Sequence, residues 1–357
     1  MRVVVDATSA ELGGIRTYVE HLLAAWADAF AQDQLLVVVP SGAGVETAGH
    51  RRHELRLRGP AVVARPLMQT LQLPRLARAH RADVVLATNP TTTLVRPGVP
   101  VAVVVHDLRH ELRSEQFSHG RRALRWAAYG RAYAVADGFV AVSRRTLDDL
   151  HRLHPPTSSK PAVVAHHGAD HVRAWPAPER SGHAIAFGHH SNKNPRLVVD
   201  AWALLARDGD PPRLLVTGLS GEARTAMSAQ VASLGLTRWV ELAPYLPEPE
   251  FHARFARAAL VVFPSDLEGF GLPVVEGMAL GKPVVLGPDP GTAEVAAGHA
   301  VIASHWSPDA LADAVRRAMA LGPERLEAAG AHAASFTWER TVRETRGLLE
   351  RLVGGGR

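Results

Sequence analysis

The sequence predicts an α/β fold made of two Rossmann-like domains, each a doubly wound parallel sheet. Short apolar runs typical of strands alternate with segments of helical spacing along the chain, which is the pattern of repeated βαβ units. At 357 residues the chain is long for one hydrophobic core and suits two. Apolar residues make up 46% of it and charged residues 21%, as in an ordinary globular protein.

The expected strands are mostly continuous apolar runs, as strands buried on both faces of a parallel sheet are. In the first half they span residues 3–6, 35–39, 62–65, 84–87, 101–105, 138–142 and 162–165. In the second half they span residues 184–187, 213–217, 239–242, 260–263, 284–286 and 300–303. The proline-rich segment Trp175–Glu179 lies between the two sets and predicts a linker and hinge.

A glycine-rich turn between an expected strand and an expected helix carries two carboxylates, Glu268 and Glu276. At the carboxyl edge of a parallel sheet, where open α/β folds bind ligands, each ionised carboxylate can hold a pair of vicinal hydroxyls. Gly269 and Gly271 allow the backbone to come close, and the helix start offers free N–H groups to an anion. The alternative is that neither glutamate binds a ligand. Glu268 would then be a first-turn carboxylate that interacts with the helix dipole, and Glu276 a solvated helix residue.

This segment resembles the E-x7-E signature of retaining glycosyltransferases of family 4, and the likeness extends into the flanking residues 259–265 and 277–285. The resemblance implies a GT-B fold, with a cleft between its two domains and a nucleotide-diphosphate sugar as donor. It implies an acceptor-side domain over residues 1–170 and a nucleotide-sugar-binding domain over residues 171–340. Residues 341–357 would form a helix that crosses back to the first domain, with a frayed tail.

A glycine pair, Gly13 and Gly14, follows the first expected strand and opens a helix. It lacks the full pattern of a dinucleotide fingerprint, and a tight turn into a helix would explain it equally well. The resembled family carries a similar loop that faces the donor phosphates or the acceptor. Gly13 and Gly14 are therefore expected to contact the donor through backbone N–H groups.

A histidine, His106, stands directly after the apolar run 101–105, in a His-Asp-Leu segment. At the carboxyl end of a parallel strand it would point to the ligand edge of the sheet. A structural or capping histidine is the alternative. The segment resembles that of mannosyl- and rhamnosyl-transferring members of the family, in which this histidine contacts the donor hexose.

A lysine, Lys193, stands at the start of an expected helix, where the helix dipole disfavours a cation unless an anion joins it. We therefore predict that Lys193 binds the diphosphate. The resembled family usually carries an arginine where this chain has His189, and a neutral imidazole offers less positive charge than a guanidinium. Either His189 is protonated with substrate bound or another arginine, such as Arg16, compensates.

Together the residues and the resemblance predict a retaining hexosyltransferase of metal-independent type that uses no cofactor beyond its donor. The predicted catalytic residues are His106, Lys193 and Glu268. The predicted donor contacts are Gly13, Gly14, His189, Lys193, Phe270, Gly271, Leu272 and Glu276. A structural or catalytic metal is not expected, because Asp208-Gly209-Asp210 reads as a polar turn and the histidines lack a convincing third ligand.

The resemblance of the His-Asp-Leu segment implies GDP-mannose or a deoxyhexose donor, with a hydroxyl acceptor in polysaccharide or natural-product glycoside biosynthesis. A nucleotide-sugar epimerase, a sugar phosphorylase of the same fold and a non-catalytic binding module remain open alternatives. An epimerase would consume the donor with no acceptor present, and a phosphorylase would accept inorganic phosphate in place of the nucleotide.

Basic residues give the chain a net charge of +5, and four arginines gather with Trp126, Tyr129 and Tyr133 on an expected helix over residues 118–136. Those arginines are Arg121, Arg122, Arg125 and Arg131. Such a helix can rest on an anionic membrane surface or present a solvated basic face. No nucleic-acid motif accompanies the charge. With no cysteine, secretory signal or membrane span in sight, a cytoplasmic protein with peripheral contact at the inner membrane face is expected.

Overall fold

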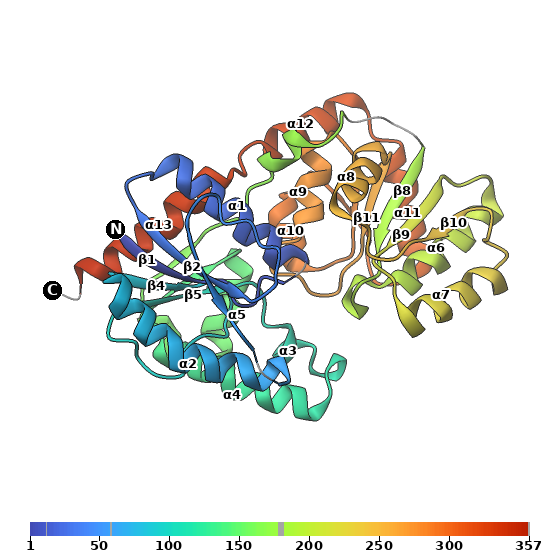
Figure 1. Ribbon diagram of the computed structural model, residues 1–357. Helices are drawn as coiled ribbons and strands as arrows, with labels where there is room; N and C mark the ends of the chain where they lie inside the picture. The colour runs from blue at the N-terminus through green and yellow to red at the C-terminus, as the bar shows by residue number, and fades with distance from the viewer. Residues whose placement is uncertain (12, 58, 178–181, 356–357) are drawn as a thin grey trace. The chain divides into compact units, whose positions relative to one another are not determined.

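The computed structural model describes residues 1–11, 13–57, 59–177 and 182–355 (Figure 1). The chain divides into two compact units, Met1–Gly168 with Thr337–Arg357, and Ala169–Phe336. The chain therefore crosses between the units twice. The expected boundaries, at residues 170 and 340, lie two and four residues further along. The end of the expected linker, from residue 178, falls outside the described residues.

The first unit is built on a seven-stranded parallel sheet in the order β3-β2-β1-β4-β5-β6-β7. Strand order reverses at β1, so the carboxyl ends of β1 and β4 flank a switch point, where open α/β sheets bind ligands. Thr88 marks this edge, since its amide donates to the Asp6 carbonyl at 3.0 Å. The strands are β1 (Arg2–Asp6), β2 (Gln34–Pro40), β3 (Arg51–Leu55), β4 (Val84–Ala87), β5 (Val101–Val105), β6 (Gly138–Ala141) and β7 (Ala162–Val164).

Helices of this unit start and stop at recognisable signals. The Ser143 hydroxyl caps α5 by accepting from the Thr146 amide at 3.1 Å, and Thr337 caps α13 in the same way. Lys160 ends α4 by donating to three carbonyls, of which Ala136 is the nearest at 2.6 Å. The helices are α1 (Gly13–Ala29), α2 (Ala61–His80), α3 (Arg109–Leu112), α4 (His119–Val135), α5 (Arg144–Leu153) and α13 (Trp338–Gly354), with 3-10 turns η1 (Ser114–Gln116) and η2 (Pro155–Ser159).

The strand expected over residues 62–65 is wrong, because these residues begin α2. Two valines favoured a strand, and two internal prolines argued against a long helix. Leu73 and Ala77, one helical turn apart, are both buried in the core of the first unit, so the buried positions follow the helical period. The strand in this region is instead β3, a polar edge strand that no apolar run announces.

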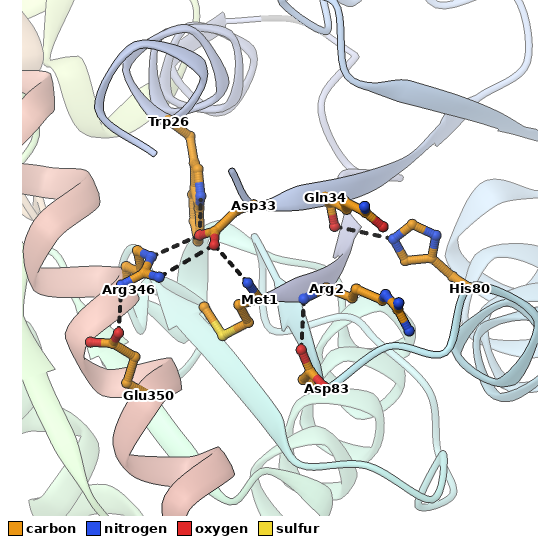
Figure 2. A network of polar contacts seen from close by, with 9 residues as sticks. All are labelled: Met1, Arg2, Trp26, Asp33, Gln34, His80, Asp83, Arg346 and Glu350. Carbon is orange, nitrogen blue, oxygen red and sulfur yellow. Dashed lines mark hydrogen bonds and ion pairs between the residues drawn. The ribbon is translucent and has the colours of Figure 1, made fainter. Parts of the chain in front are cut away.

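Helix α13 belongs to the first unit, where it packs against α1. A buried carboxylate, Asp33, fastens it there, as Figure 2 shows: Arg346 donates to Asp33 Oδ2 at 2.7 Å, and the Trp26 indole donates to the same oxygen at 3.0 Å. The amino group of Met1 lies 2.7 Å from Oδ1. Burial alone would raise the pKa of Asp33, but these hydrogen bonds outweigh it and lower the pKa.

The second unit repeats the scheme with a six-stranded parallel sheet in the order β10-β9-β8-β11-β12-β13. Its switch point lies between β8 and β11. Its strands are β8 (His183–Phe187), β9 (Arg213–Thr217), β10 (Val240–Leu242), β11 (Leu260–Phe263), β12 (Val284–Leu286) and β13 (Val301–Ile302). Its helices are α6 (Pro195–Asp208), α7 (Gly221–Ser233), α8 (Glu248–Arg257), α9 (Leu272–Ala279), α10 (Pro290–Ala296), α11 (Pro308–Met319) and α12 (Pro323–Ala333), with turns η3 (Asp170–Ala174) and η4 (Ser191–Lys193).

The predicted fold class of two Rossmann-like parallel-sheet domains is confirmed. Trp202 of α6 shows how the second core closes, since its side chain is fully buried and its indole donates to the Pro212 carbonyl at 2.9 Å. Within the described ranges, no helix is both long and apolar enough to cross a membrane.

Candidate functional site

Two of the predicted catalytic residues meet at the switch point of the second sheet. The Lys193 ammonium forms a short ion pair with Glu268 Oε1, and the Asn192 side-chain amide donates to the same oxygen at 2.8 Å. The ammonium also lies 4.4 Å from the centre of the Phe263 ring, a cation–π contact. Lys193 is only 8% exposed. The anion that its position requires is thus supplied by the carboxylate of Glu268.

Backbone contacts hold the loops of Lys193 and Glu268 together. Asn192 donates to the Leu267 carbonyl at 3.1 Å and accepts from the Asp266 amide at 2.9 Å through its own carbonyl. Asn194, whose φ of 50° lies in the left-handed region, donates to the Pro264 carbonyl at 2.8 Å. The two asparagines, in the connection after β8, therefore hold the loop after β11 that carries Glu268. Sequence reasoning gave them no role, because the contacts span about 75 residues.

The turn after Glu268 is shaped by two glycines. Gly271 has a φ of +86° and forms the N-terminal boundary of α9, a conformation that favours glycine. Gly291, at the start of α10, lies so close to the loop that an added Cβ would overlap the Glu268 carbonyl oxygen. The Asp289 side chain caps α10 by accepting from the Thr292 amide at 2.9 Å. This capped helix end therefore supports the turn that carries Glu268.

The second carboxylate, Glu276, lies on the inner side of α9 and is almost fully buried. His171 of η3 donates from Nε2 to Glu276 Oε1 at 3.1 Å. The His171 ring meets the edge of Trp175, which in turn stacks on His252 at 4.2 Å between ring centroids. Sequence reasoning missed these three aromatic residues, although His171 directly follows a segment, residues 166–170, that resembles the family.

The other predicted donor contacts of this unit differ in accessibility. Phe270 is buried and packs edge-on against Phe336, with ring centroids 5.8 Å apart. Leu272 is half-buried and begins α9. His189 is exposed after β8, where its ring packs against His190 at 4.9 Å between ring centroids, and a Cβ added to Gly218 would lie 2.9 Å from the His189 Cβ. Of the two phosphate-binding candidates, Lys193 is thus paired inside the unit and His189 stands at its surface.

The predicted residues of the first unit lie at its own sheet edge. Gly13 has a φ of 67° and begins α1, and an added Cβ at Gly14 would meet open space. His106 donates from Nε2 to the Thr88 carbonyl at 2.9 Å, so Nδ1 is left as the acceptor nitrogen of a neutral ring. Burial lowers the pKa of His106, which favours that neutral form. An acceptor nitrogen of this kind can take a hydrogen bond from a sugar hydroxyl.

A buried polar cluster next to His106 was not predicted. Asp6 ends β1 and accepts from the Thr8 hydroxyl at 2.8 Å and from Gln69 of α2 at 2.9 Å. Burial raises the pKa of Asp6 to about 6 despite these hydrogen bonds. The Thr88 hydroxyl donates to the Asp6 carbonyl at 2.9 Å, so the cluster joins the residue that holds His106. It braces the ligand edge of the first sheet.

The two aspartates of the D-x-D sequence lie at the end of α6, each beside a different arginine. Asp208 pairs with Arg316 and Asp210 with Arg238. Among the described residues, no group of three or more histidine, aspartate or glutamate side chains is arranged to hold a metal ion.

Comparison with known families covers most of the chain. Residues 177–334 match the model described as "Glycosyl transferases group 1", and residues 12–173 match the model described as "Glycosyltransferase Family 4". With two Rossmann-like units and the paired carboxylate turn, the fold is that of the GT-B glycosyltransferases. The chain belongs to the glycosyltransferase families that these two models describe.

Curated relatives include D-inositol 3-phosphate glycosyltransferases. One from Catenulispora acidiphila is 31% identical over 62% of this chain, and one from Salinispora tropica is 30% identical over 70% of it. The chain spans 56% and 58% of the lengths of these two proteins.

Solved structures support the fold over nearly the whole chain. Sucrose-phosphate synthase from Thermosynechococcus elongatus aligns with a TM-score of 0.73 at 15% identity, covering 99% of this chain and 100% of the other. Anabaena HepE in complex with UDP and glucose aligns with a TM-score of 0.73 at 17% identity and the same coverage. At such identities the likeness concerns the fold alone.

Proposed function

We propose that the protein is a retaining glycosyltransferase that moves a hexose from a nucleotide-diphosphate sugar to a hydroxyl acceptor. The observation that carries this proposal is the Lys193–Glu268 pair, which places a cation and a carboxylate in contact at a sheet switch point. One buried carboxylate, Glu276, follows within the same segment. Membership of the glycosyltransferase families supports the reaction class.

The Lys193–Glu268 pair suits a ligand that offers each of the two side chains a new partner. A diphosphate would supply an anion to Lys193, and hexose hydroxyls would supply donors to Glu268. The two side chains can then exchange their mutual contact for substrate contacts without leaving a buried charge unpaired. In this proposal Glu276 holds the ribose hydroxyls and Nδ1 of His106 accepts from a hydroxyl of the hexose.

The reaction breaks the bond between the anomeric carbon and the diphosphate oxygen and forms a bond from that carbon to the acceptor oxygen. The departing phosphate oxygen takes the acceptor proton, so the products are a nucleoside diphosphate and a glycoside. Negative charge grows on the diphosphate as the bond breaks. Lys193 and nearby backbone N–H groups would therefore stabilise the transition state more than the ground state. In this proposal no metal takes part.

The donor base and the acceptor are to be identified by experiment. The His-Asp-Leu segment favours GDP-mannose, whereas the HepE complexes contain UDP and glucose and the curated relatives are named for D-inositol 3-phosphate. Calorimetry with GDP, UDP, dTDP and ADP, with and without magnesium, identifies the base. We expect one nucleotide to bind selectively and Glu276→Ala to weaken its binding, because Glu276 holds the ribose in this proposal. Absence of binding by every nucleotide would overturn the proposal.

We also propose a peripheral membrane contact through an apolar-basic face of the first unit. Of the ten exposed large apolar residues described, six lie on α2, on α4 or in the loop between β4 and β5. They are Val63, Leu67, Leu71, Val95, Leu124 and Trp126, the last 66% exposed. Across α2 and α4 the sequence has seven arginines and no acidic residue. Exposed apolar side chains among basic ones suit an anionic lipid surface.

Hydrogen bonds hold the parts of the apolar-basic face together. The Leu94 amide donates to Thr70 of α2 at 2.9 Å, and Arg131 of α4 donates to the Leu94 carbonyl at 2.7 Å. Figure 1 shows α2 and α4 side by side, and the two helices are in contact. The loop with Val95 is thereby fixed to both helices.

Sedimentation with lipid vesicles tests the contact. We expect binding to vesicles containing phosphatidylglycerol and little binding to pure phosphatidylcholine. Leu71→Ser with Trp126→Ser should reduce binding about tenfold, the effect of removing two apolar anchors. Trp306→Ser, which removes an exposed tryptophan of the second unit, is the matched control. Equal binding by the double variant and the wild type would overturn the apolar-basic face as the contact.

A further inference from the structure

His171 reaches the carboxylate of Glu276 from a turn that begins directly after the first crossing of the chain between the two units. The crossing lies between Gly168 and Ala169, and η3 starts at Asp170. His171 and Glu276 are separated by 105 residues in sequence and by 3.1 Å between Nε2 and Oε1. We propose that His171 is a positioning residue that orients Glu276 for the nucleotide. The inference rests on the proposed function.

Burial makes the contact effective. The side chains of His171 and Glu276 are 4% and 7% exposed, so water competes weakly for either group. A carboxylate on a helix has several rotamers, and a hydrogen bond to one oxygen restricts them. Since an ionised carboxylate has about four acceptor positions, Oε1 and Oε2 retain capacity for ligand hydroxyls after accepting from His171. The imidazole thus orders the carboxylate without using up its acceptor capacity.

The His171 ring is itself held in place. It meets Trp175 at 5.7 Å with an interplanar angle of 73°, and Trp175 stacks on His252 of α8 at 4.2 Å. A ring fixed by packing can hold its partner within the narrow geometry that a binding site needs. His171 therefore acts as a rigid donor and not as a mobile surface histidine.

The second crossing of the chain contacts the same segment. Phe336, the last residue of the second unit, packs edge-on against Phe270 at 5.8 Å. The Phe336 carbonyl accepts from the Ala169 amide at 2.9 Å, so the two crossings are hydrogen-bonded to each other. His171, beside the first crossing, and Phe336, beside the second, thus both contact residues 268–276. Order at Glu276 is coupled through His171 to the start of the connecting segment.

Four single variants and one double variant test the inference by calorimetry with the nucleoside diphosphate that the wild type binds. His171→Ala should weaken binding about tenfold, the effect of one lost hydrogen bond in a buried site. His171→Gln keeps a donor near the Nε2 position and should remain within about twofold of the wild type. His183→Ala is the matched control, because His183 bonds to the Arg254 carbonyl at the same 3.1 Å within this unit. It should bind as the wild type does.

Non-additivity separates positioning from a general structural role. If His171 acts through Glu276, His171→Ala combined with Glu276→Ala should bind no more weakly than Glu276→Ala alone. Steady-state kinetics should show the donor KM raised about tenfold and kcat within about threefold, as for lost ground-state binding.

The failures are distinguishable. A wild type that binds no nucleoside diphosphate overturns the proposed function and this inference with it. A wild type that binds, a weakened Glu276→Ala and an unchanged His171→Ala overturn this inference alone. An equal loss in His171→Gln and His171→Ala also overturns it, because the donor would then not matter.

Discussion

Gly291 and Glu268 approach so closely that the glycine has no room for a side chain. A Cβ on Gly291 would overlap the Glu268 carbonyl oxygen, so the start of α10 and the carboxylate turn are packed backbone against backbone. Backbone atoms cannot turn aside as a flexible side chain can. The position of Glu268 therefore depends on a residue with no functional group of its own.

Gly291→Ala should displace the turn. We expect the free energy of unfolding to fall by about 1–3 kcal/mol, as for other overpacked sites, and nucleotide-sugar turnover to fall with it. Denaturant unfolding and turnover measure the two effects. Gly322→Ala is the control, since an added Cβ there meets no atom within 4 Å and its φ is −75°. Unchanged turnover in Gly291→Ala would contradict the support assigned to this glycine.

Lys193→Ala should lower kcat by about 10²–10³, the scale of losing one charge contact to the transition state. The variant also leaves the Glu268 carboxylate without its cation, so stability is measured by thermal unfolding alongside turnover. Arg238→Ala removes an exposed cation of the same unit and should change neither. A loss of turnover below tenfold in Lys193→Ala would contradict the phosphate role.

Asp33→Asn should destabilise the first unit by about 3–5 kcal/mol at pH 7, because it removes the buried negative charge that the partly buried Arg346 and the Met1 amino group share. Glu350→Gln is a matched control, since Glu350 pairs with the same arginine but its side chain is 57% exposed. That change should cost less than about 1 kcal/mol. Urea unfolding measures the free energy of unfolding of both variants. Equal losses of stability would show that burial of the Asp33 network (Figure 2) does not matter.

Glu111 gives the stability of the first unit a defined dependence on pH. Burial would raise its pKa, but the hydrogen bond from His154 at 2.8 Å and the His110 ring nitrogen 3.2 Å away lower the pKa from 4.5 to about 2. The folded state therefore binds this proton more weakly than the unfolded state. The resulting stability is present above pH 4.5 and is lost as the pH falls towards 2.

Urea unfolding between pH 5 and pH 3 measures this contribution, which should be on the order of 1 kcal/mol after solvent screening. Glu111→Gln carries no proton to titrate, so its stability should fall less steeply over the same interval. Parallel curves for the variant and the wild type would contradict the assignment. Other acids, Asp33 among them, contribute equally to both curves.

Sequence reasoning predicted the parts of this protein in which local pattern decides structure. The apolar runs predicted both parallel sheets, since a strand buried on two faces must be apolar along its length. The segment from Ala258 to Leu280 predicted a strand, a glycine turn and a helix in that order, and the structure has them as β11, the turn and α9. The pattern failed twice. At residues 62–65 two valines predicted a strand where α2 begins, and at β3 the polar sequence of an edge strand gave no signal.

By itself, then, the sequence determined two Rossmann-like sheets and the residues that line their carboxyl edges, because periodicity and turn chemistry act over a few neighbours. Only the tertiary structure decided that Lys193 is neutralised by Glu268, that His171 contacts Glu276 and that Gly291 supports the turn. These contacts join residues 75 and 105 positions apart in the first two cases. Their geometry follows from the packing of strand connections at one sheet edge, which no local pattern encodes.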